Sequence, residues 1–522
     1  MSFKRVYQPL CYFFFVVSLS ACSMLPTDFE QVASHAYSDT EQTWLGKTAS
    51  NIQIDDSENS AMYLISEGTD AFLTRMALLS KAERSVDVQY FIWKADIIGK
   101  LLMDKMIELA DKGVRVRLLL DDLNIDSETK AILFAMDHHE LIDVRIYNPF
   151  SSSGYKAPAA LADTARINRR MHNKSFTVDS QYTIVGGRNI EESYFSANVR
   201  SNYADLDIVA VGPVVAEVNE QFDIYFNSPF AIPGYIFDDH KSHKDALAQV
   251  RQALSAYVLS VQDSDYVQDL RNTAMYKRIE SGLAGDNEQL IYRGKAHVIY
   301  DSPDKTLGKS ELETTYLITL LRSHANKIEH SLELISPYFV PGDKGTKHLV
   351  ALVEQGISVR VITNSLASTD GIMAQSGYAR QRYNLLKGGV ELYELKPKAK
   401  SKASRSLSRS AEAKSALHAK TYIFDRKEVY IGSFNFDPRS ANINTELGVV
   451  CEIPAMAAYI ATELFDKNLK ASAYQVTLKN DAVVWLETID DDVIVHDVQP
   501  ETSWWRRFNL NLYSILPIES QL

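Results

Sequence analysis

One eighteen-residue pattern occurs twice in the sequence, and this repeat constrains the fold more than any other feature. Residues 172–189 and 418–435 both read H-x-K-x4-D-x6-G-[GS]-x-N, and their histidines lie 246 residues apart. A second landmark, a glycine that follows a helical pattern, repeats at Gly113 and Gly356, 243 residues apart. Nearly constant offsets between several landmarks indicate an internal duplication, which periodicity within one segment could not produce. We therefore expect two related lobes.

Each lobe is expected to belong to the α/β class. Residues 86–92 alternate like a strand, 98–110 have helical spacing, and 114–122 resemble a strand buried on both faces. Strand, helix and strand within about thirty residues indicate a βαβ unit. The same order returns at 332–339 and 355–362. The sequence thus predicts, in each lobe, a mixed, mainly parallel sheet flanked by helices.

The length of the chain agrees with two lobes, since 522 residues exceed the size of one ordinary hydrophobic core. We expect the lobes at 61–235 and 296–470, with a polar helical insert or linker at 236–295. A C-terminal extension follows at 471–522. Within it, one helical face would carry Trp505, Phe508, Leu512 and Ile515, beside Arg506 and Arg507. This pattern suits an interfacial membrane helix, and a terminal helix docked on the protein's own core is the alternative.

The N-terminus resembles a bacterial export signal. Lys4 and Arg5 precede an apolar run, 10–19, which is too short to span a bilayer. The run leads into Leu19-Ser20-Ala21-Cys22, which resembles the lipobox of bacterial lipoproteins, where the cysteine is acylated. A plain signal peptide or an uncleaved anchor is the alternative.

From the lipobox resemblance we expect 1–22 to be a lipoprotein signal peptide that ends at the acylated Cys22, and 23–60 to be a tether. The protein would then be lipid-anchored in the bacterial cell envelope, on the periplasmic face. The outer membrane is favoured over the inner membrane, because Ser23 rather than an aspartate follows the cysteine.

Composition narrows the possible partners. The net charge of −12 argues against a large nucleic-acid surface, because duplex binding neutralises phosphates with basic side chains. Seven basic residues gather locally at 396–414, either as a solvated loop or as a segment that meets anionic phospholipid. The chain contains three cysteines, Cys11, Cys22 and Cys451, so we expect no disulfide framework and no zinc site.

The repeated pattern points to phosphate chemistry. In a strand, residues two apart share a face, so His172 lies beside Lys174. A cationic lysine and a glycine-rich turn that ends in asparagine would bind anionic oxygens. Two such sets would surround one phosphate. The set comprises His172, Lys174 and Asn189 in the first copy and His418, Lys420, Ser433 and Asn435 in the second.

Histidines in this setting can do covalent catalysis. A neutral imidazole can attack phosphorus, and a second, protonated imidazole can give its proton to the leaving alcohol. No metal is expected, because lysine is a poor metal ligand and neither copy offers a compact His/Cys/carboxylate cluster. The motif aspartates, Asp179 and Asp425, have the opposite strand parity, so we expect them to anchor the turn from behind. For a single copy, a packing histidine would be the simpler explanation; the complete duplication favours a shared active site.

The two copies resemble the paired HKD motifs of the phospholipase D superfamily, and the resemblance extends over 86–453. It implies a two-lobed α/β sandwich with one active site at the lobe junction, which works through a phosphohistidine and needs no cofactor. His172 would be the nucleophile and His418 the general acid, and both lysines and both asparagines would bind phosphoryl oxygens.

The family also places a carboxylate downstream of each motif, where it orients the histidine of that motif. Glu446 matches this place in the second repeat. Asp205 is our choice in the first repeat, with Asp207 as its competitor.

Within the superfamily, several stretches are most similar to the bacterial C-type cardiolipin synthases: 118–122, 148–151, 168–174, 185–190 and 432–440. This similarity implies a phosphatidyltransferase that acts on glycerophospholipids and passes a phosphatidyl group to phosphatidylglycerol. The alternative is a phospholipase D hydrolase that releases phosphatidic acid. A nuclease or a non-catalytic lipid-binding lipoprotein is less favoured. The expected partners are phospholipid substrates and a membrane, with no nucleic acid.

Overall fold

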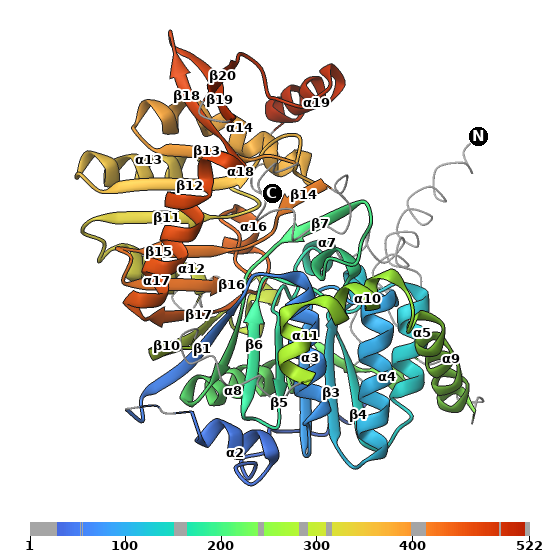
Figure 1. Cartoon of the computed structure of the whole chain (residues 1–522). Coiled ribbons are helices and arrows are strands. Elements are labelled where there is room, and N and C mark those ends of the chain that lie inside the picture. Colours follow the sequence, from blue (N-terminus) through green and yellow to red (C-terminus); the bar gives the residue numbers. More distant parts are fainter. Residues whose placement is uncertain are drawn as a thin grey trace, which may run out of the picture.

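The computed structural model describes residues 29–52, 54, 56–150, 164–237, 245–280, 291–308, 316–397, 414–489 and 492–516. Two lobes lie one above the other in Figure 1, the N-terminal lobe in blue and green and the C-terminal lobe in yellow to red. The expected acylation site, Cys22, and most of the basic segment 396–414 lie outside the described residues.

Lobe 1 is built on a mixed sheet in which β2, β3 and β4 are parallel and the other neighbours are antiparallel. From edge to junction the order is β9-β4-β3-β2-β5-β6-β8-β1. Its strands are β1 (Asn59–Ile65), β2 (Ser85–Tyr90), β3 (Arg115–Asp121), β4 (Ile142–Tyr147), β5 (Ser175–Val178), β6 (Tyr182–Gly186), β8 (Asp207–Val211) and β9 (Ala231–Pro233). The covering helices are α3 (Gly68–Ser80), α4 (Ile97–Asp111), α5 (Ser127–Met136) and α8 (Pro213–Phe226).

Lobe 2 repeats seven of these eight strands, from β1 to β4, in the same order. Its order is β10-β17-β16-β15-β11-β12-β13, and β11, β12 and β13 are again parallel. The strands are β10 (Ile291–Tyr300), β11 (Ser331–Ile335), β12 (Ser358–Asn364), β13 (Glu391–Leu395), β15 (Thr421–Phe424), β16 (Glu428–Gly432) and β17 (Leu447–Glu452). The helices are α12 (Leu317–Ala325), α13 (Gly342–Glu354), α14 (Ile372–Lys387) and α17 (Pro454–Ala461). The predicted fold class and the internal duplication are confirmed.

The two repeated glycines end equivalent helices. Gly113 follows α4 with φ +95°, and Gly356 follows α13 with φ +88°. A residue without a Cβ adopts this left-handed conformation at little cost, so glycine turns the chain from the helix into the next parallel strand. This shared conformational need explains why both copies have glycine at this position.

The lobes join through backbone pairing and a shared core. Strands β1 and β10 pair antiparallel, with Ala61 opposite Arg293, so the two sheets form one hydrogen-bonded series among the described strands. One hydrophobic cluster crosses the junction and contains Val185 and Ile208 of lobe 1 together with Ile431 of lobe 2. Both copies of the motif therefore approach the same region of the molecule.

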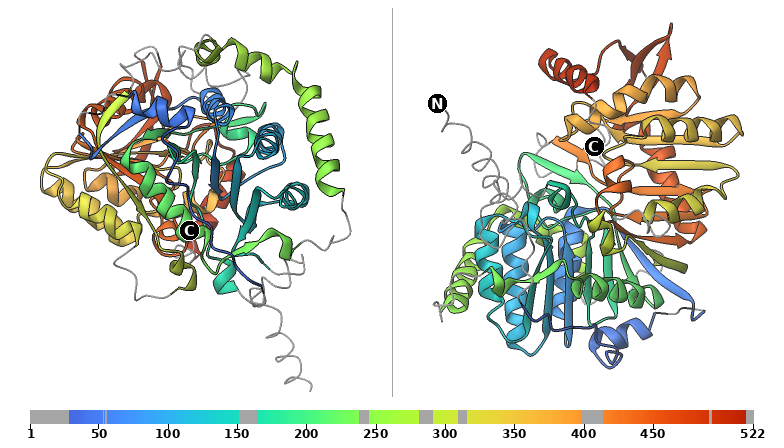
Figure 2. Two further views of the ribbon diagram at one scale, coloured as in Figure 1. Left: turned by 90° about the horizontal axis from the view of Figure 1, so that it is seen from below. Right: turned by 180° about the vertical axis from the view of Figure 1, so that it is seen from behind.

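Two expected boundaries are corrected. Residues 29–50, expected within a tether, are docked on lobe 1: Gln31 donates to the Ser228 carbonyl (3.1 Å), and α2 (Trp44–Ser50) follows. The expected insert 236–295 is helical, with α9 (Ala246–Val261), α10 (Asp265–Asn272) and α11 (Ala274–Glu280), but β10 already begins at Ile291. These helices lie on the outside of lobe 1, where Leu254 and Tyr266 join its core (Figures 1 and 2).

The C-terminal extension belongs to lobe 2. Strand β18 (Ala473–Lys479) pairs with β13, and β19 (Ala482–Ile489) and β20 (Asp492–His496) continue the sheet. The chain then enters α19 (Trp504–Ile515), which packs along α14 (Figure 1). Within the described ranges, none of the helices is long and apolar enough to cross a membrane.

Candidate active site

Each motif histidine is held by backbone pairing with the other lobe. The His172 N–H donates to the Thr445 carbonyl (2.8 Å), and the His418 N–H donates to the Ala204 carbonyl (2.8 Å). The second contact continues a parallel pair between β7 (Ser201–Ala204) and β14 (Lys414–Leu417). Both histidines precede a central strand, β5 or β15, and both are buried. The duplication thus brings the two imidazoles to one junction.

The carboxylates that orient the histidines are exchanged between the lobes. Nδ1 of His172 lies 2.8 Å from Oε2 of Glu446, and Nδ1 of His418 lies 2.7 Å from Oδ2 of Asp205. Our expectation that each carboxylate would orient the histidine of its own repeat was wrong. Thr445 and Ala204, which hold the histidine backbones, directly precede these two carboxylates in the sequence. The same cross-lobe strand contact therefore delivers both the backbone acceptor and the carboxylate.

Glu446 lies in a hydrogen-bonded pocket within lobe 2. The Ser433 hydroxyl donates to its Oε2, the atom that also contacts His172. Its own N–H donates to Asp301 (2.9 Å), which accepts from Lys305 (2.9 Å). Burial raises the pKa of Glu446 to about 7, against the lowering effect of Lys174 and the Ser433 hydroxyl. This carboxyl can therefore hold or release a proton near neutral pH.

Asp205 has a different environment. Its Oδ1 accepts from the Leu206 N–H (2.8 Å), and a Cβ at Gly187 would lie 2.3 Å from this atom, so only glycine leaves room for the carboxylate. Burial alone would raise the pKa of Asp205, but His418 and Lys420 outweigh it and lower the pKa to about 2. Asp205 therefore remains charged at neutral pH.

Asp207, the competing candidate, lies elsewhere. It is fully buried and contacts two arginines, Arg75 (3.0 Å) and Arg188 (3.4 Å). This carboxylate neutralises cations within the core of lobe 1, and Asp205 is the residue that reaches a histidine.

His418 is enclosed by cationic and aromatic groups. Nζ of Lys420 lies 2.9 Å from its Nδ1 and 3.1 Å from its Nε2. The hydroxyl of Tyr194 lies 3.4 Å from Nε2, and the Tyr203 ring centre lies 5.2 Å from the imidazole. Burial lowers the pKa of His418 to about 4, with Lys420 lowering it further and Asp205 opposing both. A bound phosphate anion would add to the effect of Asp205 and favour the imidazolium.

His172 lies beside an aromatic ring and a lysine. The Phe91 ring meets the imidazole edge to face at 5.0 Å, and Nζ of Lys174 lies 5.4 Å from the centre of the same ring. Burial lowers the pKa of His172 well below its usual value, and Lys174 and Lys420 lower it further. This imidazole is neutral at pH 7. With Nδ1 engaged by Glu446, Nε2 is the nitrogen available to react.

The lysines are buried as deeply as the histidines. Burial lowers the pKa of Lys174 well below its usual value and lowers that of Lys420 to about 8, although Asp205 and Glu446 oppose the change. Each ammonium group donates to the carbonyl of the histidine in its own motif. Lys420 therefore keeps most of its charge at pH 7 and can hold an anionic oxygen.

The two motif asparagines differ in their contacts. Asn189 turns inward: its Oδ1 accepts from the Ile92 N–H (3.1 Å), and its Nδ2 donates to the Tyr194 hydroxyl (3.0 Å). Oδ1 of Asn435 is buried and has no hydrogen-bond partner among the residues that the structure describes. Asn189 thus positions Tyr194 beside His418, whereas Asn435 has polar capacity left for a ligand.

The motif aspartates lie behind the strands, away from both histidines. Asp179 accepts from the backbone N–H groups of Glu83, Arg84 and Ser85, at 2.8 to 3.2 Å. Asp425 accepts from those of Glu329, His330 and Ser331, at 2.7 to 2.9 Å. In both lobes the carboxylate therefore ties the end of the motif strand to the segment that starts β2 or β11.

Several residues at the site lie outside the repeated pattern. Tyr194, Asp301 and Lys305 follow no spacing rule, so no pattern in the sequence predicts them. Asp370 is a fourth case: it accepts from the Tyr203 hydroxyl (2.9 Å) of lobe 1 and from the Tyr338 hydroxyl (2.8 Å) of lobe 2. Phe91 also lies at the site, and its position could have been used to predict it. It directly follows β2, and ligands bind at the carboxyl ends of parallel strands.

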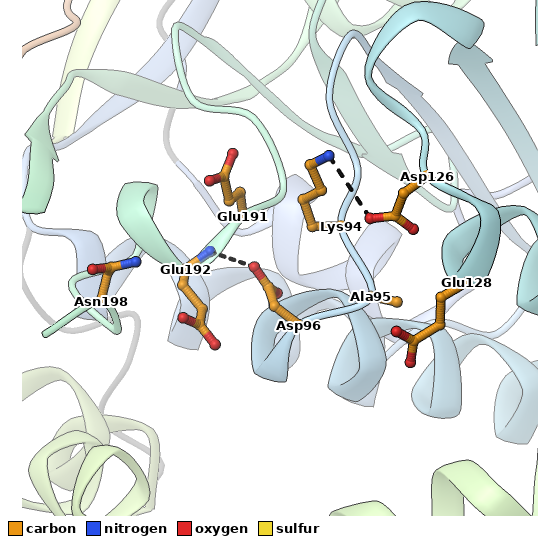
Figure 3. Close-up of a pocket in the computed structure, with 8 residues that line it drawn as sticks. All are labelled: Lys94, Ala95, Asp96, Asp126, Glu128, Glu191, Glu192 and Asn198. Carbon is orange, nitrogen blue, oxygen red and sulfur yellow. Dashed lines mark hydrogen bonds and ion pairs between the residues drawn. The ribbon is translucent and has the colours of Figure 1, made fainter. Parts of the chain in front are cut away.

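A separate pocket of about 300 Å³ lies in lobe 1, and none of the four motif histidines and lysines lines it. Figure 3 shows its lining, in which Lys94 faces Asp126 (3.8 Å) and the Glu192 N–H donates to Asp96 (2.7 Å). Glu128 and Glu191 also line the pocket, so five of its eight lining residues are acidic. An anionic wall of this kind repels phosphate, so the junction between the lobes is the better phosphate site.

The junction can support two-step transfer of a phosphoryl group. It holds a neutral imidazole with a free Nε2, a second imidazole beside a charged carboxylate, and two buried ammonium groups. Burial excludes water from these groups, which strengthens their interaction with a charged phosphodiester. The arrangement suits attack by one histidine and proton donation by the other.

Comparison with known proteins agrees with this geometry. A model for a cardiolipin synthase PLD-like domain matches residues 76–227 and 321–468, one match in each lobe. Cardiolipin synthase C of Escherichia coli (strain K12) is 36% identical over 464 residues, which cover 88% of this chain and 95% of that protein. Cardiolipin synthase B of Salmonella typhimurium is 22% identical over 449 residues, 86% of this chain and 85% of that protein.

Among solved structures, phosphatidylserine synthase of Haemophilus influenzae (Rd KW20) shares the fold. The TM-score is 0.55 at 12% identity, with 92% of this chain and 99% of that chain covered. The predicted resemblance to the phospholipase D superfamily is confirmed. The chain belongs to the cardiolipin synthase family and carries its PLD-like domain in both lobes.

Proposed function

We propose that this enzyme transfers a phosphatidyl group from a glycerophospholipid to the hydroxyl of phosphatidylglycerol and so forms cardiolipin. The crossed pairs, His172 with Glu446 and His418 with Asp205, carry the proposal. They orient two imidazoles at one buried junction, and only His418 is paired with a carboxylate that stays charged at neutral pH. The relatives named as cardiolipin synthases supply the substrate class.

In the first step, Nε2 of His172 attacks the phosphorus of the donor lipid. The bond from phosphorus to the headgroup oxygen breaks, and His418 gives this oxygen its proton. The phosphatidyl group is then bound covalently to His172. Lys174 and Lys420 hold the non-bridging oxygens, where negative charge is greatest.

In the second step, the hydroxyl of phosphatidylglycerol gives its proton to His418 while its oxygen attacks phosphorus. The bond to His172 breaks, and both histidines regain their starting protonation states. If water takes the place of this alcohol, the product is phosphatidic acid. Access of the second lipid therefore decides between transfer and hydrolysis.

The lipid products test this function. Purified full-length protein is incubated with phosphatidylglycerol alone, and we expect cardiolipin and glycerol in equal amounts by mass spectrometry. A His172→Ala variant should form neither. The matched control is His297→Ala, since His297 forms a similar pair with Glu217 (3.3 Å) on the surface.

Two outcomes would contradict the proposal. Phosphatidic acid without cardiolipin would make the protein a hydrolase. Full activity of His172→Ala would remove the catalytic role that we assign to this histidine.

We also propose that a lipid on Cys22 anchors the protein at the periplasmic face, in the outer membrane because Ser23 follows. The match of 19–22 to a lipobox supports this location. Labelling of growing cells with a tagged fatty acid should mark the wild type and Cys11→Ser but not Cys22→Ser. Label in the Cys22→Ser protein would contradict it.

A further inference from the structure

The C-terminal helix displays an apolar face that is exposed among the residues that the structure describes. In α19, the side chains of this face are between 44% and 79% exposed: Trp504, Trp505, Phe508, Leu512 and Ile515. The three aromatic rings contact one another, with Trp504 stacked on Phe508 at 5.3 Å and Trp505 at 4.8 Å from Trp504. This face is continuous over the whole length of the helix.

The opposite side of α19 is fixed to lobe 2. Leu510 is buried against the protein, and Arg506 donates to the carbonyls of Leu366 and Thr369, both at 2.6 Å. Arg380, on α14, donates to the carbonyl of Ser514 near the end of the helix. Both ends of the helix are thus held, so the apolar face is directed outward by the fold and cannot turn inward.

The loop 365–371, which accepts the hydrogen bonds of Arg506, also reaches the active site. Asp370 follows Thr369 and accepts from the hydroxyls of Tyr203 and Tyr338. The Tyr203 ring lies 5.2 Å from His418. The loop therefore contacts α19 on one side and the tyrosines beside the catalytic junction on the other. The loop thus links the anchored side of α19 to the site.

The charge of the helix favours an anionic surface as the partner. In a chain of net charge −12, residues 504–515 contain Arg506 and Arg507 and no acidic residue. Tryptophan prefers the boundary between lipid headgroups and acyl chains, and an amphipathic helix with a cation, here Arg507, beside its apolar face suits anionic lipids.

We propose that the apolar face of α19 docks on the surface of an anionic phospholipid bilayer and holds the lobe junction against it. This inference rests on the proposed function, because a lipid substrate gives the site a reason to face a bilayer. In this arrangement the loop 365–371 connects the bilayer contact to Tyr203 and Tyr338, and a lipid reaches His172 and His418 without crossing bulk water.

The first experiment locates α19 without requiring turnover. Full-length protein is mixed with phosphatidylglycerol/phosphatidylcholine vesicles whose acyl chains are brominated, and tryptophan fluorescence is measured. Bromine quenches only tryptophans in the bilayer. Residues 1–22 contain no tryptophan, so insertion of the N-terminus is silent, and Trp93 and Trp485 are buried. Trp44 is exposed, but it remains in the variant that lacks Trp504 and Trp505, so its own contribution is measured there and subtracted.

We expect quenching and a blue shift in the wild type, and loss of both when Trp504 and Trp505 are replaced by phenylalanine. The proposal would be overturned if the protein sediments with the vesicles but has the same fluorescence with brominated and with non-brominated lipid. A blue shift that grows with protein concentration without lipid would also overturn it, and would assign the face to a second copy of the chain.

The second experiment measures the consequence for turnover. A Trp505→Glu/Ile515→Glu double variant should lose about tenfold or more of its rate on vesicles. In this variant two charges replace two apolar side chains that would enter the bilayer. Its rate on short-chain lipid below the micellar concentration should match the wild type. The control is Leu259→Glu, on α9, since Leu259 is 65% exposed on another helix.

An equal loss on vesicles and on monomeric lipid would contradict docking. If no protein turns over either substrate, the proposed function fails, and the quenching result still decides whether α19 meets the bilayer.

Discussion

The two halves of the site share one sequence pattern but differ in charge. Lobe 1 supplies Asp205, whose pKa falls to about 2 because His418 and Lys420 outweigh its burial. Lobe 2 supplies Glu446, whose pKa rises to about 7 because it is buried. His418 and Lys420 stabilise the charge of Asp205, whereas Lys174 and Ser433 only partly offset the burial of Glu446.

The duplication accounts for the shared geometry of the two halves, and the different carboxylates account for their different roles. A charged carboxylate stabilises an imidazolium, so His418, beside Asp205, is the better proton donor. Glu446 is partly protonated near pH 7 and therefore stabilises an imidazolium less than a charged carboxylate does. Its partner His172 stays neutral and is the better nucleophile. The following predictions test this asymmetry.

Replacing the histidines should separate their roles most strongly. His172→Ala should lower kcat by about 10⁴-fold or more, because it removes the atom that forms the covalent bond. His418→Ala should lower it by about 10² to 10⁴-fold and let the phosphatidyl adduct accumulate on His172. Mass spectrometry of rapidly quenched protein locates the adduct. An adduct on His418 in the His172→Ala protein would reverse the roles.

Neutral replacement of the carboxylates should show which histidine needs a charge. We expect Asp205→Asn to lower kcat by about 10² to 10⁴-fold, because the imidazolium of His418 loses its counter-charge. Glu446→Gln should cost less, because Glu446 is partly protonated near pH 7 in the wild type. Steady-state kinetics on one lipid dispersion compares them, and equal losses would remove the asymmetry.

The pH profile of kcat should be bell-shaped, because the bound phosphate favours the imidazolium of His418 and leaves the two limbs to other groups. The acid limb should lie below pH 6.5, since the pKa of His172 is lowered and protonation removes the nucleophile. The alkaline limb should lie near pH 8, where Lys420 loses its charge. Lys420→Arg should move this limb upward, because arginine stays protonated. An unchanged limb would assign it to another group of the coupled site.

Replacing Ser433, the small residue beside Glu446, should change kcat less than replacing a histidine or a carboxylate does. Ser433→Gly gives lobe 2 the turn residue of lobe 1 and removes the hydroxyl that donates to Glu446. Loss of one hydrogen bond to a carboxylate corresponds to about tenfold in kcat. Ser433→Thr keeps the hydroxyl and serves as the control. A kcat equal to that of the wild type in Ser433→Gly would show that the hydroxyl does not tune Glu446.

The motif aspartates should change stability rather than rate. Asp179→Asn disturbs three backbone hydrogen bonds in a buried position and should lower the free energy of unfolding by about 1 to 3 kcal/mol. Asp425→Asn should lower it less, because Asp425 is partly exposed. Thermal unfolding measures both, and kcat of the folded variants should stay within about twofold. A large loss of kcat in stable protein would place these aspartates at the substrate.

The fold was predictable because its determinants are local and occur twice. Gly113 and Gly356 are required by the same left-handed turn, and the strand patterns around the motifs are buried in both lobes. The docked segment 29–36 was not predictable. It is held by polar contacts such as Ser34 N–H to Asn227 (2.9 Å), which leave no hydrophobic period in the sequence.

The site was predictable in its parts but not in its pairing. The repeated pattern identifies His172 and His418, and the downstream carboxylates were placed at Asp205 and Glu446. The sequence does not contain the relative position of the lobes, so it could not show that the carboxylates cross. For the same reason the inward contact of Asn189 with Tyr194 was missed, since no spacing rule links these residues to His418.

The crossed pairing also determines when, during synthesis, the chain becomes reactive. His172 leaves the ribosome with lobe 1, but its carboxylate, Glu446, follows 274 residues later. Domains generally fold in order from the N-terminus, so lobe 1 can be complete while its histidine lacks an orienting partner. A truncated or unfinished chain thus carries the motif without its reactivity, and membrane lipids are exposed to the nucleophile only once both lobes have closed around it.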